Sequence, residues 1–384
     1  MPRLLCCTDT YLPQVNGVSV VTGISVSGLE ARGWECTVVA PRYPSVPPPG
    51  ARRAGGETMI TLPSFSMPRY PEIRVAVPDV WRVRRAIRDF KPDLVHCATE
   101  FSIGAAGMRE ARRAAIPVVT SYHTDFARYT ASYGMPWLRE TVMRHIVRFH
   151  RRAARTYTPG SPARDDLVQR GVRDVEVWGR GVDTSVFSPT KRDGALRAKL
   201  GAVGRCLFVH VSRLAPEKGT EIILDAYRTV TAHLPPRSVH LVIAGEGPER
   251  ERLRARAPEG VTFLGFLDRE TELPALYATA DAFCFASTTE TLGLVVLEAM
   301  ASGTPVLAAP AGGVADHLRH RVNGISYPAR SSLALANAMI EIAQNAQLRS
   351  SLSIGARQTA ELLTWERERD RLDASYREVL ALSA

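Results

Sequence analysis

Short apolar runs alternate with amphipathic segments along most of the chain, and this pattern predicts β-strands separated by helices. In the first half we expect strands at residues 3–8, 35–40, 59–62, 94–97, 118–121, 156–158 and 175–178, and a helix at 18–32. The pattern restarts after Pro189, with strands at 206–211, 239–244, 261–264, 282–285, 306–308 and 325–327, and helices from 220 and at 248–256. Strands separated by helices of this length are typical of parallel, doubly wound sheets.

The restart divides the chain into two domains, each built on its own open sheet. We predict an N-terminal Rossmann-like domain over residues 1–186 and a C-terminal Rossmann-like domain over 187–364. Residues 365–384 alternate in charge with helical spacing, and we expect one helix there that packs back on the N-terminal domain. The predicted fold class is α/β, with two facing parallel sheets whose strand ends border a cleft.

Composition and cysteine usage indicate a globular protein from a reducing compartment. At 384 residues, 45% of them apolar, the chain can build ample cores in two domains. The six cysteines lie mostly in apolar, strand-like runs and show no C-x-x-C spacing, which favours buried thiols over disulfides or metal ligands. We expect no signal peptide before the first strand, and no apolar run reaches the roughly 18 residues that span a bilayer. We therefore expect a cytoplasmic protein.

Positive charge is concentrated in the first half of the chain. Residues 1–190 carry 26 Lys+Arg against 17 Asp+Glu, a net of +9, whereas residues 191–384 carry 23 against 22, a net of +1. Much of the excess lies in two arginine-rich segments, 81–91 and 137–155. Basic amphipathic helices can lie on an anionic membrane surface, but ordinary solvated helices would show the same pattern, and both interpretations stay open. No nucleic-acid recognition motif accompanies the arginines, so nucleic acid is not an expected partner.

Two acids eight residues apart, Glu290 and Glu298, flank an apolar run that is expected to be a helix. Glu290 would lie in the loop that leaves strand 282–285, and Glu298 about two turns into the helix. Ligands of open α/β sheets bind at the carboxyl ends of strands, and a helix start offers N–H groups to an anion. Carboxylates accept hydrogen bonds from hydroxyls but do not bind phosphate. We therefore expect a ligand with phosphates in the middle and a polyol at each end, as in a nucleotide sugar.

Two cations follow the first strand of the second half, in a turn that Pro216 and Gly219 keep from becoming a regular helix. Arg213 and Lys218 at a strand end suit a diphosphate, the arginine as a fork and the lysine as a point charge. The alternative is an exposed pair in a surface loop.

The first half offers two further candidates at strand ends. Gly17 stands at the start of the first helix, where glycine lets the backbone approach a ligand, although glycine turns after strands are common. His123 follows strand 118–121 and is expected to face the same cleft, whereas a purely structural histidine is the alternative.

Together these segments resemble a known family. They are Thr8-Asp-Thr-Tyr-Leu-Pro-Gln-Val-Asn-Gly-Val, Tyr122-His-Thr-Asp, Arg180-Gly-Val-Asp, Ser212-Arg-Leu-Ala-Pro-Glu-Lys-Gly, Gly245-Glu-Gly-Pro and the segment from Glu290 to Glu298. Their order from residue 3 to about 330 resembles the retaining GT-B glycosyltransferases of family GT4. Within that family the chain looks most similar to bacterial GDP-mannose-dependent α-mannosyltransferases, and sulfoquinovosyl-diacylglycerol synthases also look similar.

The resemblance implies a role for each matching residue. The catalytic set would be His123, Arg213, Lys218 and Glu290: the two cations stabilise the leaving nucleotide diphosphate, and His123 and Glu290 contact the donor sugar. The further donor-binding positions would be Gly17 and Leu294 with Val295 at phosphate, Leu292 with Gly293 at the sugar, and Glu298 at the ribose. The acceptor-side candidates are Asp9, Asn16, Asp125 and Tyr129.

The implied reaction is hexosyl transfer with retention, without a metal ion or a cofactor beyond the nucleotide sugar. The sequence has no D-x-D pair to hold a metal, and Arg213, Lys218 and a helix dipole can supply the charge instead. No carboxylate is evidently placed as a nucleophile, so we expect front-side attack, with the leaving phosphate oxygen taking the acceptor proton. The expected reaction transfers mannose from GDP-mannose to a lipid or lipid-linked glycan, in peripheral contact with an anionic membrane surface.

Three alternatives remain open at this point. The chain has Glu290-Thr-Leu-Gly where family members often carry Glu-Gly-Phe-Gly, a variant also found in the sulfolipid branch. A UDP-sugar-dependent glycosyl or sulfoquinovosyl transferase to diacylglycerol is therefore the main alternative. A nucleotide-sugar 2-epimerase would convert the donor without an acceptor, and a non-catalytic sensor module would only bind it.

Overall fold

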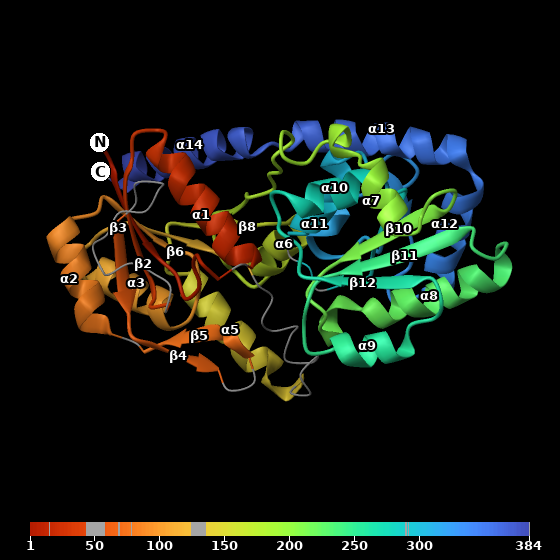
Figure 1. Cartoon of the computed structure of the whole chain (residues 1–384). Helices are drawn as coiled ribbons and strands as arrows, with labels where there is room; N and C mark the ends of the chain where they lie inside the picture. Colours follow the sequence, from red (N-terminus) through yellow and green to blue (C-terminus); the bar gives the residue numbers. More distant parts are fainter. Residues whose placement is uncertain are drawn as a thin grey trace. The chain divides into compact units, whose positions relative to one another are not determined.

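The computed structural model describes residues 1–14, 16–43, 58–67, 70–77, 79–123, 136–288, 290 and 292–383. The chain forms two compact units, which we call the N-terminal unit (Met1–Gly179 with Trp365–Ala384) and the C-terminal unit (Arg180–Thr364). Figure 1 shows both. The division falls between Gly179 and Arg180, a few residues before the predicted boundary, and the last helix belongs to the N-terminal unit.

The N-terminal unit is built on a seven-stranded parallel sheet with the order β3-β2-β1-β6-β7-β8-β9. Its strands are β1 (Arg3–Cys7), β2 (Glu35–Pro41), β3 (Thr58–Leu62), β6 (Leu94–Cys97), β7 (Val118–Ser121), β8 (Arg155–Thr158) and β9 (Val175–Val177). Its helices are α1 (Gly17–Glu30), α2 (Val80–Phe90), α3 (Ser102–Arg113), α5 (Arg139–His150), α6 (Ser161–Gln169) and α14 (Trp365–Ser383), with a 3₁₀ turn at Pro136–Leu138. An antiparallel pair, β4 (Ser64–Met67) and β5 (Tyr70–Ala76), was not predicted.

Helices cover both faces of this sheet because alternate strand residues point to opposite sides. Leu5 and Cys7 of β1 share an apolar core with residues of α2, α3 and α5. The other face carries α1 and α14, where the Tyr376 hydroxyl lies 2.9 Å from Nδ1 of His96 in β6 and Trp34 Nε1 donates to Asp373 at 2.6 Å. The last helix therefore covers the N-terminal sheet, and Figure 1 shows it beside α1.

The C-terminal unit repeats the plan with six parallel strands in the order β12-β11-β10-β13-β14-β15. They are β10 (Cys206–Val211), β11 (Val239–Ala244), β12 (Val261–Gly265), β13 (Ala282–Phe285), β14 (Val306–Ala308) and β15 (Gly324–Ser326). The α-helices are α7 (Gly194–Lys199), α8 (Thr220–His233), α9 (Arg250–Arg256), α10 (Glu272–Thr279), α11 (Leu294–Ala301), α12 (Ser332–Gln344) and α13 (Ala346–Leu362). Two apolar cores, one on each face, pack these helices against the sheet.

Each sheet has one point at which consecutive connections leave in opposite directions. In the C-terminal unit this switch point lies between β10 and β13, and in the N-terminal unit between β1 and β6. Loops that diverge there leave a crevice at the carboxyl edge, which is where open α/β sheets bind ligands.

Two predictions from composition can also be compared with the structure. All six cysteines are free, and five of them are buried, as the sequence indicates. Among the helices of the described segments, none is both long enough and apolar enough to cross a membrane.

Candidate functional site

The turn after β10 holds the two predicted cations in a fixed backbone. Pro216 begins a 3₁₀ turn that ends at Lys218, and Gly219 follows in the left-handed region with a φ of +68°. A Cβ atom at Gly219 would lie 3.0 Å from the carbonyl oxygen of Ala286, so the turn packs closely against the end of β13. Glycine alone tolerates both the positive φ and the close contact with Ala286 at low cost, which explains why the turn ends at this residue.

Arg213 is oriented by a carboxylate of the same turn. Its Nη2 donates to Oε1 of Glu217 at 2.7 Å, and the Glu217 side chain is buried. The Arg213 side chain itself is 39% exposed. A guanidinium carries five N–H donors, which makes this ion pair compatible with contact to phosphate.

Lys218 and Glu290 meet at the switch point of the C-terminal sheet. The Lys218 ammonium donates to Oε2 of Glu290 at 2.7 Å, and both side chains are partly exposed. One residue comes from the loop after β10 and the other from the loop after β13. The structure thus brings together two residues that the sequence separates by 72 positions.

The backbone at Glu290 is held by a glycine pair. The Gly313 N–H donates to the Glu290 carbonyl oxygen at 3.0 Å, and a Cβ atom at Gly312 would lie 1.9 Å from that oxygen. Any side chain at Gly312 would therefore displace the loop that carries Glu290.

Helix α11 begins after Gly293, which caps it with a φ of +76°. The N–H groups of the first helical residues, beginning at Leu294 and Val295, have no partner within the helix and suit an anion. Glu298 is the fifth residue of α11, so it lies a little over one turn into the helix and not two turns as predicted.

Glu298 is buried and paired with an arginine that sequence reasoning missed. Arg269 Nε and Nη2 lie 2.8 Å and 2.7 Å from the same oxygen, Oε1 of Glu298. Burial raises the pKa of Glu298, and the charge and hydrogen bond of Arg269 oppose that rise. A single arginine in a loop after β12 carries no signature of this contact.

In the N-terminal unit, Asp9 closes the switch point between β1 and β6. Its Oδ1 accepts from the Ile103 N–H at 2.8 Å, and its Oδ2 accepts from the Thr99 hydroxyl at 2.6 Å. The Thr99 hydroxyl also accepts from the Asp9 N–H at 2.9 Å. The two carboxylate oxygens of this acceptor-side candidate therefore hold the loop after β1 to the start of α3 and to the loop that precedes it.

Asn16 and Gly17 form the start of α1. The Asn16 side chain accepts from the Ser19 N–H at 2.9 Å, caps the helix, and donates to the Thr10 hydroxyl at 2.8 Å. Gly17 is the first helical residue, and a Cβ atom there would meet no described protein atom within 4 Å. Packing in the described part of the chain thus gives no reason for glycine at this position. The other acceptor-side candidates, Asp125 and Tyr129, lie outside the described residues.

His123 follows β7 beside a network of buried polar residues. Burial and the nearby His150 lower the pKa of His123 to about 4, so its imidazole is neutral near pH 7. His150 lies 2.9 Å from the Thr120 hydroxyl through Nδ1 and 3.3 Å from Glu100 Oε1 through Nε2. A neutral imidazole can both donate and accept a hydrogen bond.

Two family models match the chain one after the other. The model described as Glycosyltransferase Family 4 matches residues 15–186, and the one described as Glycosyl transferases group 1 matches residues 194–359. A GDP-mannose-dependent alpha-mannosyltransferase of Mycolicibacterium smegmatis is 34% identical over 98% of this chain and 98% of its own length. The chain belongs to glycosyltransferase family 4.

Other relatives of this glycosyltransferase carry different names. A sulfoquinovosyl transferase of Arabidopsis thaliana is 34% identical over 68% of this chain and 51% of its own. An alpha-monoglucosyldiacylglycerol synthase of Streptococcus pneumoniae is 31% identical over 80% of this chain and 70% of its own. The crystal structure of HepE from Anabaena in complex with UDP superposes with a TM-score of 0.78 at 22% identity, covering 98% of this chain and all of that one. The predicted family, GT-B fold and hexosyltransferase class are confirmed.

Proposed function

We propose that this glycosyltransferase moves mannose from GDP-mannose to a lipid or lipid-linked glycan, with retention and without a metal ion. The observation that carries the proposal is the Lys218–Glu290 pair at the switch point of the C-terminal sheet. At this point a cation that can bind phosphate lies beside a carboxylate that can accept hydrogen bonds from sugar hydroxyls. A nucleotide sugar requires both. The name of the Mycolicibacterium relative supports GDP-mannose as the donor.

Each predicted residue takes a chemical task in this proposal. Arg213 and Lys218 stabilise the departing diphosphate, together with the N–H groups at the start of α11. Glu290 holds hydroxyls of the sugar, and neutral His123 contacts the sugar near the reacting carbon. The acceptor oxygen forms its bond to that carbon while the bond to phosphate breaks. The leaving phosphate oxygen takes the acceptor proton.

A UDP-sugar donor with a diacylglycerol acceptor is the second candidate. The name of the Streptococcus relative supports its diacylglycerol glycolipid. The name of the Arabidopsis relative supports a sulfoquinovosyl donor, as does Leu292, which stands where family members often carry phenylalanine. A thermal-shift series with GDP, UDP, GDP-mannose and UDP-glucose separates the two, because a ligand at 100 times its Kd adds about 2.7 kcal/mol. Stabilisation by UDP compounds alone would contradict GDP-mannose as donor.

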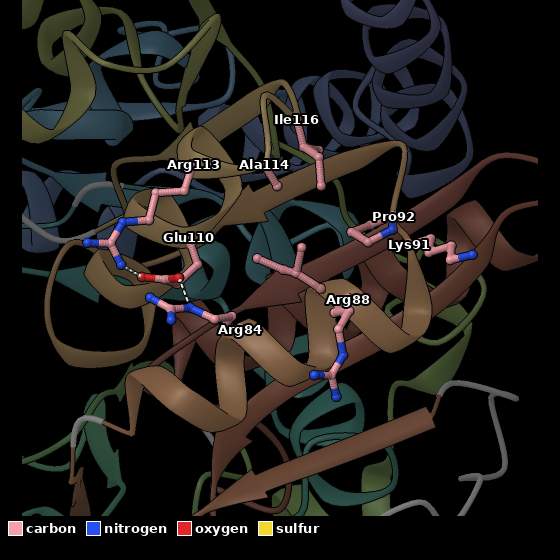
Figure 2. A pocket seen from close by; sticks show the side chains of 9 residues that line it. Arg84, Arg88, Lys91, Pro92, Glu110, Arg113, Ala114 and Ile116 are labelled. Atoms are coloured by element: carbon pink, nitrogen blue, oxygen red, sulfur yellow. Dashed lines mark hydrogen bonds and ion pairs between the residues drawn. The ribbon is translucent and has the colours of Figure 1, made fainter.

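A basic surface of the N-terminal unit supports peripheral contact with an anionic membrane. Trp81 on α2 is 76% exposed, and the Arg84 guanidinium lies 4.9 Å from its ring centroid. A groove of about 670 Å³ lies between α2 and α3, and Figure 2 shows the side chains that line it. Its cationic lining residues are Arg84, Arg88, Lys91 and Arg113. Exposed tryptophan beside arginines is typical of helices that lie at a membrane surface.

The groove also contains a buried acid, which reduces its positive charge. Glu110 pairs with Arg84 and Arg113 at 2.7 Å each, whereas Arg88 pairs with Asp89 outside the groove lining. Sedimentation with phosphatidylglycerol vesicles at low salt tests the membrane contact. Binding that Arg88→Glu with Lys91→Glu weakens would support it, and equal binding to neutral vesicles would contradict it.

Incubation with labelled GDP-mannose and a lipid extract tests the whole proposal. Transfer predicts a labelled lipid and one GDP for each mannose moved. Conversion of the donor without an acceptor would indicate an epimerase, and binding without turnover would indicate a sensor module. Either of these outcomes would overturn the proposal.

A further inference from the structure

Arg269 projects from a turn whose backbone is fixed on both sides. Oδ1 of Asp268 accepts from the N–H groups of Glu270 and Thr271, at 3.0 Å and 2.9 Å. The Asp268 N–H donates to Glu272 Oε2 at 2.8 Å, so the turn is closed in both directions immediately before α10. These hydrogen bonds fix the backbone from which the Arg269 side chain reaches α11.

The guanidinium has two further contacts, both in the C-terminal unit. Its carbon lies 5.4 Å from the centroid of the buried Phe187 ring, in a cation–π arrangement. Its Nε and Nη2 both approach Oε1 of Glu298, so that Arg269 leaves the second carboxylate oxygen, Oε2, unengaged. The Arg269 side chain is 30% exposed, whereas that of Glu298 is 3% exposed.

A buried carboxylate without a partner is costly and tends to take up a proton. Arg269 opposes the rise in the pKa of Glu298 that burial causes, so it favours the ionised form, and it fixes which oxygen is occupied. An ionised acceptor forms hydrogen bonds roughly twice as strong as a neutral one. The strength of the hydrogen bond that Glu298 can accept from a ligand thus depends on Arg269, which lies in another loop.

We propose that Arg269 is a positioning residue that determines selectivity for the ribose of the donor nucleotide. It holds Oε1 of Glu298, and Oε2 accepts from a ribose hydroxyl. The inference rests on the proposed ribose role of Glu298 and adds the group that makes this role possible. Arg269 acts through Glu298 and needs no contact with the reacting atoms.

Binding of GDP and of 2′,3′-dideoxy-GDP, measured by calorimetry, tests this without an activity assay. If GDP does not bind, UDP and its dideoxy analogue replace the pair. A hydrogen bond to a charged group contributes about 1.5–3 kcal/mol, so wild type should prefer the ribonucleotide by about ten- to hundred-fold. The measured quantity is the Kd of the dideoxy nucleotide divided by the Kd of the ribonucleotide. In Arg269→Met this ratio is expected to fall to within about threefold of one, chiefly through weaker ribonucleotide binding.

A matched control comes from another partly buried ion pair of the same unit. Arg197 Nη2 donates to Oδ2 of Asp281 at 2.6 Å, and Asp281 immediately precedes β13, at the opposite edge of the sheet from Glu290. Arg197→Met should lower stability and leave the ratio at its wild-type value. If Arg269→Met does not fold, Arg269→Gln, which keeps an amide NH₂ donor but no charge, is expected to lower the ratio at least threefold.

Glu298→Gln separates failure of this inference from failure of the donor assignment. If Glu298→Gln lowers the ratio and the Arg269 variants keep it, the positioning role is wrong and the ribose role of Glu298 stands. If wild type itself shows no preference, or Glu298→Gln leaves it unchanged, the ribose role is wrong and the inference falls with it.

Discussion

The two units share an architecture but use the switch point of the sheet differently. In the C-terminal unit, Lys218 and Glu290 stand on the two loops that diverge there, partly exposed and paired at 2.7 Å. In the N-terminal unit, Asp9 stands at the corresponding place, and both of its oxygens bind the start of α3 and Thr99. The same topological position thus carries a candidate site in one unit and a structural clamp in the other.

The difference shows that polar residues at corresponding strand ends can have quite different hydrogen-bond partners. Lys218 and Glu290 come from different loops and pair with each other. Both oxygens of the Asp9 carboxylate instead accept hydrogen bonds from a backbone N–H and a hydroxyl. Substitution of each of these residues tests the comparison.

The largest effect is expected at Lys218. Lys218→Ala should lower the transfer rate by about 10²–10³, because it removes one preorganised charge from the leaving diphosphate. Initial rates with saturating GDP-mannose measure this, with Lys199→Ala, an exposed lysine on α7, as the control. Near wild-type turnover in folded Lys218→Ala would refute the mechanism.

Asp9→Asn should act on stability and not on donor binding. It replaces a charged acceptor that holds two hydrogen bonds, so the N-terminal unit should lose roughly 2 kcal/mol of unfolding free energy. Denaturant unfolding measures the loss, and calorimetry with GDP should give an unchanged affinity. Loss of transfer at unchanged stability would instead place Asp9 in acceptor binding.

Gly17→Ala offers a smaller and cleaner comparison. The added methyl group meets no described atom within 4 Å, so the fold should tolerate it, whereas a donor phosphate close to the backbone would be displaced. We expect a several-fold higher KM for the donor at unchanged melting temperature. Gly194→Ala is the matched control, because Gly194 also begins a helix and also has open space at its Cβ. Equal KM values for both variants would remove Gly17 from the site.

The smallest expected effect concerns His123, whose charge should not change near neutral pH. Because the pKa of His123 is lowered to about 4, its imidazole should stay neutral from pH 8 down to about pH 5 and take up a proton only below that. Ring-proton NMR of the histidine-labelled protein follows this titration, and His123→Gln assigns the signal. A midpoint near the ordinary value of 6.5 would contradict the neutral role proposed for this residue.

Much of the fold could be predicted from the sequence because the apolar period of each strand is visible locally. Every predicted strand is present to within one residue at either end, and the final helix spans Trp365–Ser383 as expected. The β4–β5 pair was missed, because Pro63, Pro68, Pro71 and Pro78 interrupt or flank this segment, and proline argues against a strand. The depth of Glu298 in α11 was overestimated because Gly293 delays the helix start.

The candidate site could be predicted only in part. The turn of Arg213 and Lys218 and the loop of Glu290 carry local signals, namely proline, glycine and charge at strand ends. The partner of Glu298 is Arg269, 29 residues away, and its contact depends on packing that no local pattern encodes. The structural use of Asp9 likewise depends on Thr99 and Ile103, which folding brings to it.

Calorimetric titration of GDP-mannose into wild type, Lys218→Ala and Asp9→Asn tests the central claim most directly. The claim is that the C-terminal unit holds the donor through the loops at its switch point. It predicts that Lys218→Ala weakens binding at least tenfold and that Asp9→Asn leaves it within about twofold of wild type. Equal weakening by both variants, or unchanged binding in Lys218→Ala, would contradict it.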